Sequence, residues 1–183
     1  MKILVIVGMP GSGKTEALKL IEKQGIPFFN MGDVVTKIEP KKRGIKKINE
    51  YIEDEIRMDL RKSLGPAAIA IVTTDEVEKM NADIVAISGI HSFAELNYFK
   101  EKFGNDFTLI AIQASTKLRS KRSAKRKIRP LSKEEFEHRE HEYAKNFEIQ
   151  KIMEKADYKI NNEGTVKQFR QDIKRVVKEI IRH

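Results

Sequence analysis

The chain has 183 residues, the usual size of one domain with a single core. It contains no cysteine, which excludes disulfides and thiolate metal sites and suits the reducing cytoplasm, where we expect the protein to act. No apolar run approaches the roughly 18 residues of a membrane-spanning helix, so we expect no membrane partner. The net charge of +9 indicates an anionic ligand, and much of it comes from eight Lys and Arg residues between positions 117 and 129.

Strand and helix patterns alternate in the first half of the chain. Residues 3–7 are a short β-branched run, 16–24 carry apolar residues at helical spacing, and 26–29 read as a second strand. A helix then starts and is interrupted at Pro40 and the basic residues after it, before a longer helix at about 45–64. The run at 66–72 fits either a helix or a strand, and we favour a helix because Val77 and Met80 continue a helical face.

The second half continues the alternation. Residues 83–88 and 107–113 are continuous apolar runs, typical of strands buried on both faces, and a helix at 94–103 separates them. Further patterns predict helices at 117–127, 132–146, 149–155 and 166–181, with a short strand at 158–160. Five strands alternating with helices predict a parallel α/β sheet with right-handed crossovers.

The segment "GMPGSGKT" joins the first strand to the first helix and satisfies the pattern G-x-x-x-x-G-K-[ST]. Its glycines leave backbone amides free to close around phosphate oxygens, and the following helix directs its positive end at the anion. Lys14 supplies a charge for the terminal phosphates, and Thr15 offers a hydroxyl to Mg²⁺. We therefore predict ATP and Mg²⁺ as cofactors. The predicted nucleotide-binding residues in this loop are Gly8, Met9, Pro10, Gly11, Ser12, Gly13, Lys14 and Thr15.

Five segments of the chain, taken in their order along the sequence, resemble the archaeal adenylate-kinase-related proteins. Those proteins belong to the nucleoside-monophosphate-kinase and dephospho-CoA-kinase branch. The five segments are the loop above, "NMGDVV" at 30–35, "SGIHSFAELNYFKEKF" at 88–103, the arginine-rich stretch and "ADYKINNEG" at 156–164. The resemblance implies a P-loop NTPase fold, a three-layer α/β/α sandwich with a five-stranded parallel sheet. It implies one domain, 1–183, with an acceptor-side helical insertion at about 33–80 and a lid at about 117–147. It also implies transfer of the ATP γ-phosphate to a nucleotide or nucleotide-like small molecule.

The resemblance also implies an acceptor site after the second and third strands. Its residues are Asn30, Gly32, Asp33, Gly89 and His91. Asp33 is of chemical interest because a hydroxyl acceptor needs a carboxylate to take or orient its proton, whereas a monophosphate acceptor needs only cations. The alternative is that Asp33 caps the helix that follows it.

The arginine-rich stretch corresponds to the lid of these kinases. Arg119, Arg122, Arg126 and Arg129 are spaced by three, four and three residues, which puts them on one face of a helix as a clamp for phosphate. The alternative is a solvated basic face paired with the acidic helix downstream. Arg139 is a further lid cation or pairs with neighbouring glutamates. In the late loop, Asn161 or Asn162 corresponds to the segment beside the adenine base, although a turn followed by a Thr165 helix cap has the same sequence pattern.

Three departures from the family pattern affect the acceptor side. After the third strand, relatives have aspartate, glycine and then arginine, and this chain has Ser88, Gly89 and His91. After the second strand, a further arginine is replaced by Thr36 or Lys37. Pro130 and Leu131 replace paired aspartates after the lid arginines. These changes indicate an altered acceptor or a weakened kinase.

The candidate catalytic residues are Lys14, Asp33, Arg122 and Arg126. An ATP-hydrolysing or ATP-dependent regulatory protein is the second hypothesis. Nucleic-acid binding through the basic helix is the third, because no aromatic residue interleaves its cations.

Overall fold

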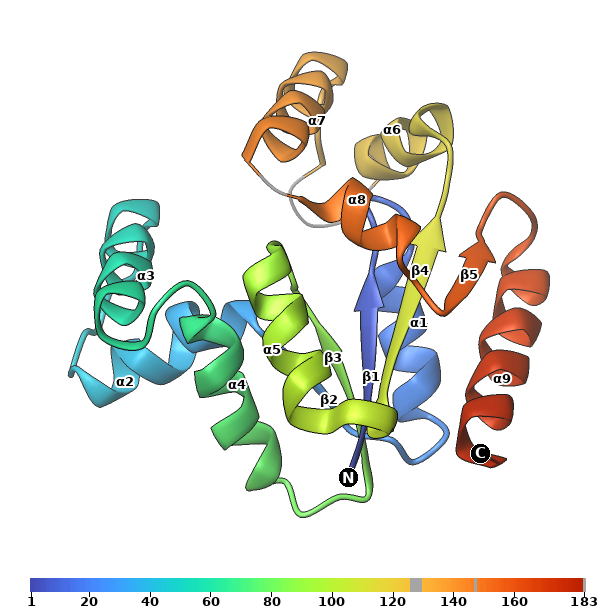
Figure 1. Ribbon diagram of the computed structural model, residues 1–183. Helices are drawn as coiled ribbons and strands as arrows, with labels where there is room; N and C mark the ends of the chain where they lie inside the picture. Colours follow the sequence, from blue (N-terminus) through green and yellow to red (C-terminus); the bar gives the residue numbers. More distant parts are fainter. Residues whose placement is uncertain (126–129, 147, 183) are drawn as a thin grey trace.

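The computed structural model describes residues 1–125, 130–146 and 148–182, and it contains a parallel sheet with helices on both faces (Figure 1). The strands are β1 (Lys2–Val7), β2 (Phe28–Asn30), β3 (Ile84–Ser88), β4 (Phe107–Gln113) and β5 (Tyr158–Asn161). Their order in the sheet is β2-β3-β1-β4-β5, and every neighbouring pair is parallel. The predicted α/β sandwich with five parallel strands is confirmed.

The central strand β1 separates two apolar cores. Its odd-numbered residues Ile3, Val5 and Val7 pack toward α3 (Glu50–Leu64), α4 (Ala68–Glu78) and α5 (Phe93–Phe103). Leu4 and Ile6 point the other way, toward α1 (Lys14–Glu22) and α9 (Val166–Arg182). Because successive side chains of a strand alternate between faces, a strand covered on both sides must be apolar throughout, as β1 is. A short 3₁₀ turn, η2 (Gly104–Asp106), links α5 to β4.

One predicted helix boundary needs correction, and the choice made at one ambiguous run is confirmed. The helix predicted from residue 45 begins only at Glu50, because the side chain of Asn49 accepts a hydrogen bond from the Ile52 amide at 2.9 Å and caps it. The ambiguous run at 66–72 contributes to α4, so the choice of helix is confirmed. Local capping thus moves one end of a helix without changing which elements form.

The predicted interruption at Pro40 is wrong. A π-helical turn, η1 (Val34–Ile38), runs directly into α2 (Glu39–Lys42), and Pro40 lies in the first turn of α2. Proline is tolerated at the first positions of a helix, where its fixed φ is already helical. The amide of Glu39 bonds back to the Val34 carbonyl in the wider π pattern. The helical segment ends instead at Gly44, whose φ of 69° is left-handed.

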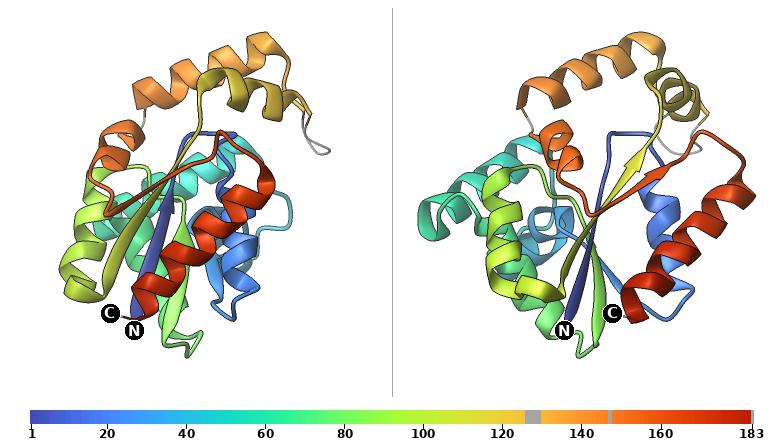
Figure 2. Two further views of the ribbon diagram at one scale, coloured as in Figure 1. Left: turned by 90° about the vertical axis from the view of Figure 1, so that its right-hand side faces the viewer. Right: turned by 45° about the vertical axis from the view of Figure 1, so that its right-hand side comes forward.

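Three helices lie over the carboxyl ends of the strands (Figures 1 and 2). They are α6 (Thr116–Ala124), α7 (Lys133–Asn146) and α8 (Ile149–Glu154). Of the four arginines predicted to share one helical face, Arg126 and Arg129 lie outside the described residues. None of the helices formed by the described residues combines the length and apolar character that crossing a bilayer requires.

Candidate phosphate and acceptor site

The loop between β1 and α1 has a backbone that only glycine can adopt. Gly13 precedes α1 with a φ of 111°, and a Cβ built on it would lie 2.4 Å from Nδ2 of Asn162. A Cβ on Gly8 would lie 2.6 Å from the carbonyl oxygen of Ile112. The conformation and the close packing together explain why the sequence has glycine at these positions.

The loop is supported by Asn162, which directly follows β5, and by a residue of α6. Nδ2 of the buried Asn162 donates to the Ser12 carbonyl at 2.7 Å, and Nη2 of Arg122 donates to the Asn162 carbonyl at 2.9 Å. The amide of Ser12 donates to the Met9 carbonyl at 3.1 Å. The buried Ser12 hydroxyl has no hydrogen-bond partner among the described residues. Asn162, predicted to lie beside a base, contacts the loop backbone in this structure.

Lys14 lies across the mouth of the loop. Its Nζ donates to the Gly8 carbonyl at 2.5 Å and to the Met9 carbonyl at 3.2 Å. An ammonium held by carbonyl oxygens can transfer its bonds to phosphate oxygens, so the loop, its glycine-lined backbone and the N-terminus of α1 fit a phosphate. No group of three or more His, Cys, Asp or Glu that could hold a metal occurs in the part of the chain that the structure describes. A magnesium ion would therefore depend on the Thr15 hydroxyl and on phosphate oxygens, as the sequence predicts.

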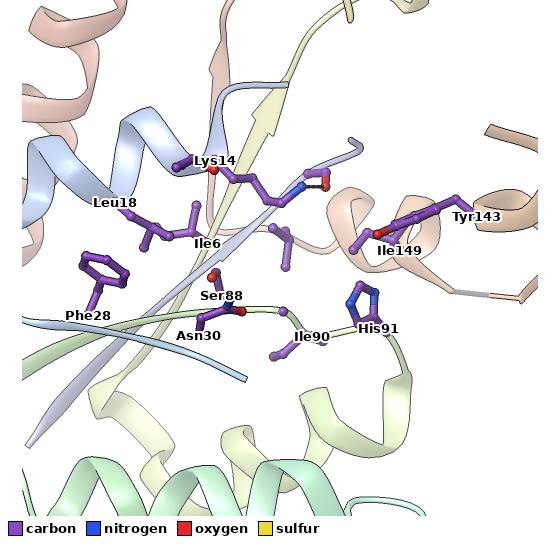
Figure 3. Close-up of a pocket in the computed structure, with 14 residues that line it drawn as sticks. Ile6, Lys14, Leu18, Phe28, Asn30, Ser88, Ile90, His91, Tyr143 and Ile149 are labelled. Carbon is purple, nitrogen blue, oxygen red and sulfur yellow. Dashed lines mark hydrogen bonds between the residues drawn. The ribbon is translucent and has the colours of Figure 1, made fainter. Parts of the chain in front are cut away.

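A cavity of about 280 Å³ lies directly beyond Lys14 (Figure 3). Figure 3 shows Lys14 on one side, Asn30 and Ser88 on the opposite side, and His91 with Tyr143 at one end. Apolar side chains close the other end; they are Ile6, Leu18 and Phe28. Asn30 and Ser88 meet because β2 and β3 pair in this register at their carboxyl ends. Three of the predicted acceptor residues, Asn30, Gly89 and His91, thus line one cavity with the phosphate-loop lysine.

Gly32 and Asp33 lie outside that lining. The amide of Gly32 donates to Oδ1 of Asn30 at 3.2 Å. The Asp33 carboxylate pairs with Lys37 Nζ at 2.7 Å and makes no capping hydrogen bond, so the alternative role of helix cap is wrong. Its role toward an acceptor stays a prediction.

His91 is held in place by its backbone and stays uncharged. Its amide donates to Oε2 of Glu95 at 2.8 Å, and the same oxygen accepts from the Ser92 amide in the capping box that starts α5. Burial, and then the charges of Lys14, Arg57 and Arg61, lower the pKa of His91 from 6.5 to about 4. Burial also raises the pKa of Glu95, an effect that the amide hydrogen bonds oppose. His91 therefore offers a neutral imidazole to the cavity, in contrast to the arginine of the family pattern.

Helices α6 and α7, where the sequence predicts a lid, are joined by a buried ion pair. Nη2 of Arg119 lies 2.5 Å from Oε2 of Glu140, and Nη1 also donates to the Pro10 carbonyl of the phosphate loop at 3.2 Å. The guanidinium of Arg119 stands 5.7 Å from the ring centroid of Phe136. Arg119 was predicted to bind nucleotide; in this structure it ties α7 to the loop, and nucleotide contact stays a prediction.

The chain is similar to known proteins over almost its whole length. The chain matches the AAA domain over residues 7–140. It is 37% identical to the UPF0200 protein of Pyrococcus horikoshii over 184 residues, which cover 98% of this chain and 97% of that protein. The chain belongs to the UPF0200 family.

Solved structures show the same fold. The crystal structure of TT1252 from Thermus thermophilus has a TM-score of 0.67 at 17% identity, covering 97% of both chains. Shikimate kinase from Aquifex aeolicus has a TM-score of 0.57 at 22% identity, covering 96% of both. The UPF0200 chain therefore has the fold of these proteins, and the predicted resemblance to P-loop kinase-related proteins is confirmed at the level of the fold.

A second hollow of about 480 Å³ lies on the outer side of the phosphate loop of this UPF0200 chain. Arg122 of α6 and Arg139 and Tyr143 of α7 line it together with the loop. Arg139 takes part in none of the ion pairs between described residues, so the pairing with nearby glutamates is not what the structure contains. Lys14, Thr15 and Tyr143 line both this hollow and the inner cavity.

Sequence reasoning missed Tyr143. Its ring packs edge-on against His91 with centroids 5.9 Å apart, which joins the lid to the loop after β3. The signal was present: Phe136, Glu140 and Tyr143 are spaced by four and three residues and therefore share one face of α7. A separate hollow of about 350 Å³ is lined by Ser115, Arg119, Asn161 and Glu163 among others, and Asn161 is one of the two asparagines predicted as candidates to lie beside adenine.

Proposed function

We propose that this UPF0200 chain is an ATP-dependent kinase that transfers the γ-phosphate to a small molecule, a nucleotide or nucleotide-like acceptor. One observation carries the proposal. The hollow outside the phosphate loop, of about 480 Å³, and the cavity beyond Lys14, of about 280 Å³, share three lining side chains: Lys14, Thr15 and Tyr143. A phosphate on the loop and a molecule in the cavity would thus meet at the same three side chains. Catalysis of phosphoryl transfer consists mostly of such positioning together with charge stabilisation.

The donor side is built from cations and amides. ATP with Mg²⁺ would supply the phosphoryl group and a metal charge that offsets the phosphates. The Nζ of Lys14 would give up its hydrogen bonds to the carbonyls of Gly8 and Met9 and donate to phosphate oxygens instead. The hydroxyl of Thr15 would hold the metal. Arg122 and Arg139 face the outer hollow, where planar guanidinium groups can bind phosphate oxygens and stabilise developing charge.

The acceptor side is built from neutral hydrogen-bonding groups. Asn30, Ser88 and His91 offer donors and acceptors to a bound molecule, and Phe28 with Leu18 gives an apolar wall. This lining supports a small acceptor with polar groups at one end and an apolar part at the other. The fold neighbour named as a shikimate kinase supports kinase chemistry on a small molecule in this architecture.

Product detection tests the proposal. The protein is incubated with Mg·ATP and a panel of nucleoside monophosphates, dephospho-CoA and shikimate, and products are followed by phosphorus NMR and mass spectrometry. We expect a phosphorylated acceptor that disappears in Lys14→Ala and persists in Lys19→Ala, a matched change at an exposed lysine of the same helix. A product that survives Lys14→Ala would contradict the proposed site.

A second function, ATP hydrolysis or ATP-dependent regulation, is favoured by the acceptor side. Ser88 stands where the family pattern has aspartate, and the neutral His91 stands in the region where that pattern has arginine. Release of ADP in the panel experiment without any modified acceptor would support this second function. Absence of saturable binding of a fluorescent ATP analogue would contradict both.

A further inference from the structure

Helix α9 lies along one face of the molecule (Figure 2). Its sequence places a row of basic residues on the outer side of the helix. Five apolar side chains of this 17-residue helix are buried in the core; they are Phe169, Ile173, Val176, Val177 and Ile180. Successive residues are turned by 100° around the helix axis. Six exposed cations therefore lie within an arc of about 140°, on the side of the helix opposite its buried residues. This basic row consists of Lys167, Arg170, Lys174, Arg175, Lys178 and Arg182.

The carboxylates around the basic row neutralise only part of it. Arg170 pairs with Glu16 of α1 and Arg175 with Asp172, each at 3.4 Å. Glu179 accepts a hydrogen bond from the Tyr158 hydroxyl at 3.2 Å. The other four cations, Lys167, Lys174, Lys178 and Arg182, take part in none of the ion pairs between described residues.

The pattern of the basic row does not serve the stability of the helix. Arg170, Lys174, Lys178 and Arg182 follow one another at intervals of four residues, so each like charge faces the next across one turn and destabilises the helix. The first turn carries no acidic residue, although negative charge is favoured at that end. In α3, by contrast, Arg57 pairs with Glu53 one turn away at 2.9 Å.

We propose that the basic row binds the sugar–phosphate backbone of a nucleic acid. From Lys167 to Arg182 the row is about 22 Å long at 1.5 Å per residue, which is long enough to span several phosphates of a strand. A polyanion bound there would relieve the repulsion between successive cations and release its own counterions. This surface lies on α9, apart from the basic lid helix that the sequence indicates, and the proposal is independent of kinase activity.

The burial of the apolar side of α9 distinguishes a nucleic acid from a lipid surface. Helices that lie on membranes insert their apolar face between the lipids. In α9 that face is already packed in the core of the protein, with Phe169 and Val176 each only 3% exposed. The outer side therefore presents mainly charge, with Ile181 (48% exposed) as an isolated apolar side chain among the cations rather than an apolar face, which suits phosphates held in water.

Fluorescence anisotropy tests the proposal with a labelled single-stranded RNA of mixed sequence, about 20 nucleotides long, over roughly 50 to 300 mM salt. The variant Lys167→Gln/Lys174→Gln/Lys178→Gln removes three cations of the basic row. Its matched control, Lys117→Gln/Lys121→Gln/Lys125→Gln, removes three exposed lysines on and just after α6. A thermal unfolding scan of each variant establishes that it is folded.

We expect the wild-type affinity to fall with salt at a logarithmic slope of about −3, since four cations each contribute about −0.7 on a single strand. The α9 variant is expected to bind at least about tenfold more weakly at low salt with a slope of about −1, and the α6 variant within about threefold of the wild type. Absence of RNA binding by the wild type, or an equal loss in both variants, would overturn the proposal. Binding to phosphatidylserine vesicles through the α9 lysines without RNA binding would overturn it in favour of a membrane surface.

Discussion

The phosphate loop and the acceptor cavity share Lys14 but are built in different ways. The loop is a contiguous segment, Gly8–Thr15, whose shape follows from glycine conformations and from the buried Asn162 behind it. The cavity has no such local origin, since β2, β3, α7 and α8 each contribute side chains to it. The phosphate loop is therefore specified by backbone geometry, whereas the cavity proposed to hold the acceptor depends on how distant elements pack.

A change in the loop backbone should have the largest effect. In Gly13→Ala the new Cβ would be 2.4 Å from Asn162 Nδ2 at a left-handed φ. We expect loss of ATP binding and a fall of about 2–4 kcal/mol in the free energy of unfolding, measured by calorimetric titration and urea denaturation. Gly25→Ala is the control, because Gly25 has a φ of 84° with nothing within 4 Å of the added Cβ, and it should cost about 1 kcal/mol and keep ATP binding. ATP affinity in Gly13→Ala equal to that of the control would contradict a backbone-specified donor site.

Removal of Arg119 tests how the lid is joined to the loop. In Arg119→Met the carboxylate of Glu140 loses a partner in a mostly buried position, and we expect a loss of about 3 kcal/mol in stability. The double variant Arg119→Met/Glu140→Met removes both charges and should recover most of that loss. Urea denaturation of the three proteins measures the effect. A double variant no more stable than the single variant would mean that the ion pair is not what holds α7 in place.

The pH dependence of stability tests the environment of His91 on the acceptor side. Its pKa is about 4 in the folded protein and 6.5 in the unfolded chain, so the unfolded state binds more protons between these values. Stability is fully present above pH 6.5 and is lost as the pH falls toward 4, by about 2–3 kcal/mol. The variant His91→Gln should lose less stability over this range, while the titration of Glu95, whose pKa is raised by burial, is common to both proteins. Parallel stability curves for the two proteins would contradict a buried neutral His91.

The smallest effect is expected at Asp33. Its ion pair with Lys37 is largely exposed, so Asp33→Asn should change the free energy of unfolding by only about 0.5 kcal/mol. Denaturation by urea measures this change, with Lys37→Gln as the matched variant of the partner. A loss above about 2 kcal/mol would show that Asp33 supports the fold beyond that pair.

The sequence was sufficient for the features that depend on neighbouring residues. The strands, the glycine loop and the amphipathic α9 each follow from patterns within one segment, and the structure contains them. Two boundaries failed for local reasons: Asn49 caps a helix that apolar spacing placed earlier, and a π-helical turn accommodates Pro40. The helix face shared by the lid arginines reaches beyond the described residues, and its full extent stays a prediction.

The acceptor side could be predicted only in part, because its contacts join residues far apart in the chain. Position after β2 and β3 was enough to place Asn30 and His91 in the cavity, but it also suggested Asp33, which points to Lys37. The contact of Tyr143 with His91 and the pair of Arg119 with Glu140 depend on how α7 packs over the loop. Helical spacing shows that side chains share a face, but it does not show which neighbour they meet.

A crystal structure with ADP, Mg²⁺ and a γ-phosphate mimic tests the central claim most directly. We expect the β-phosphate within Gly8–Thr15 and Lys14 Nζ released from the Gly8 and Met9 carbonyls onto phosphate oxygens. We also expect the mimic at the side chains that the two cavities share, Lys14, Thr15 and Tyr143. A nucleotide bound elsewhere, or Lys14 still bonded to its own loop with nucleotide present, would contradict the account.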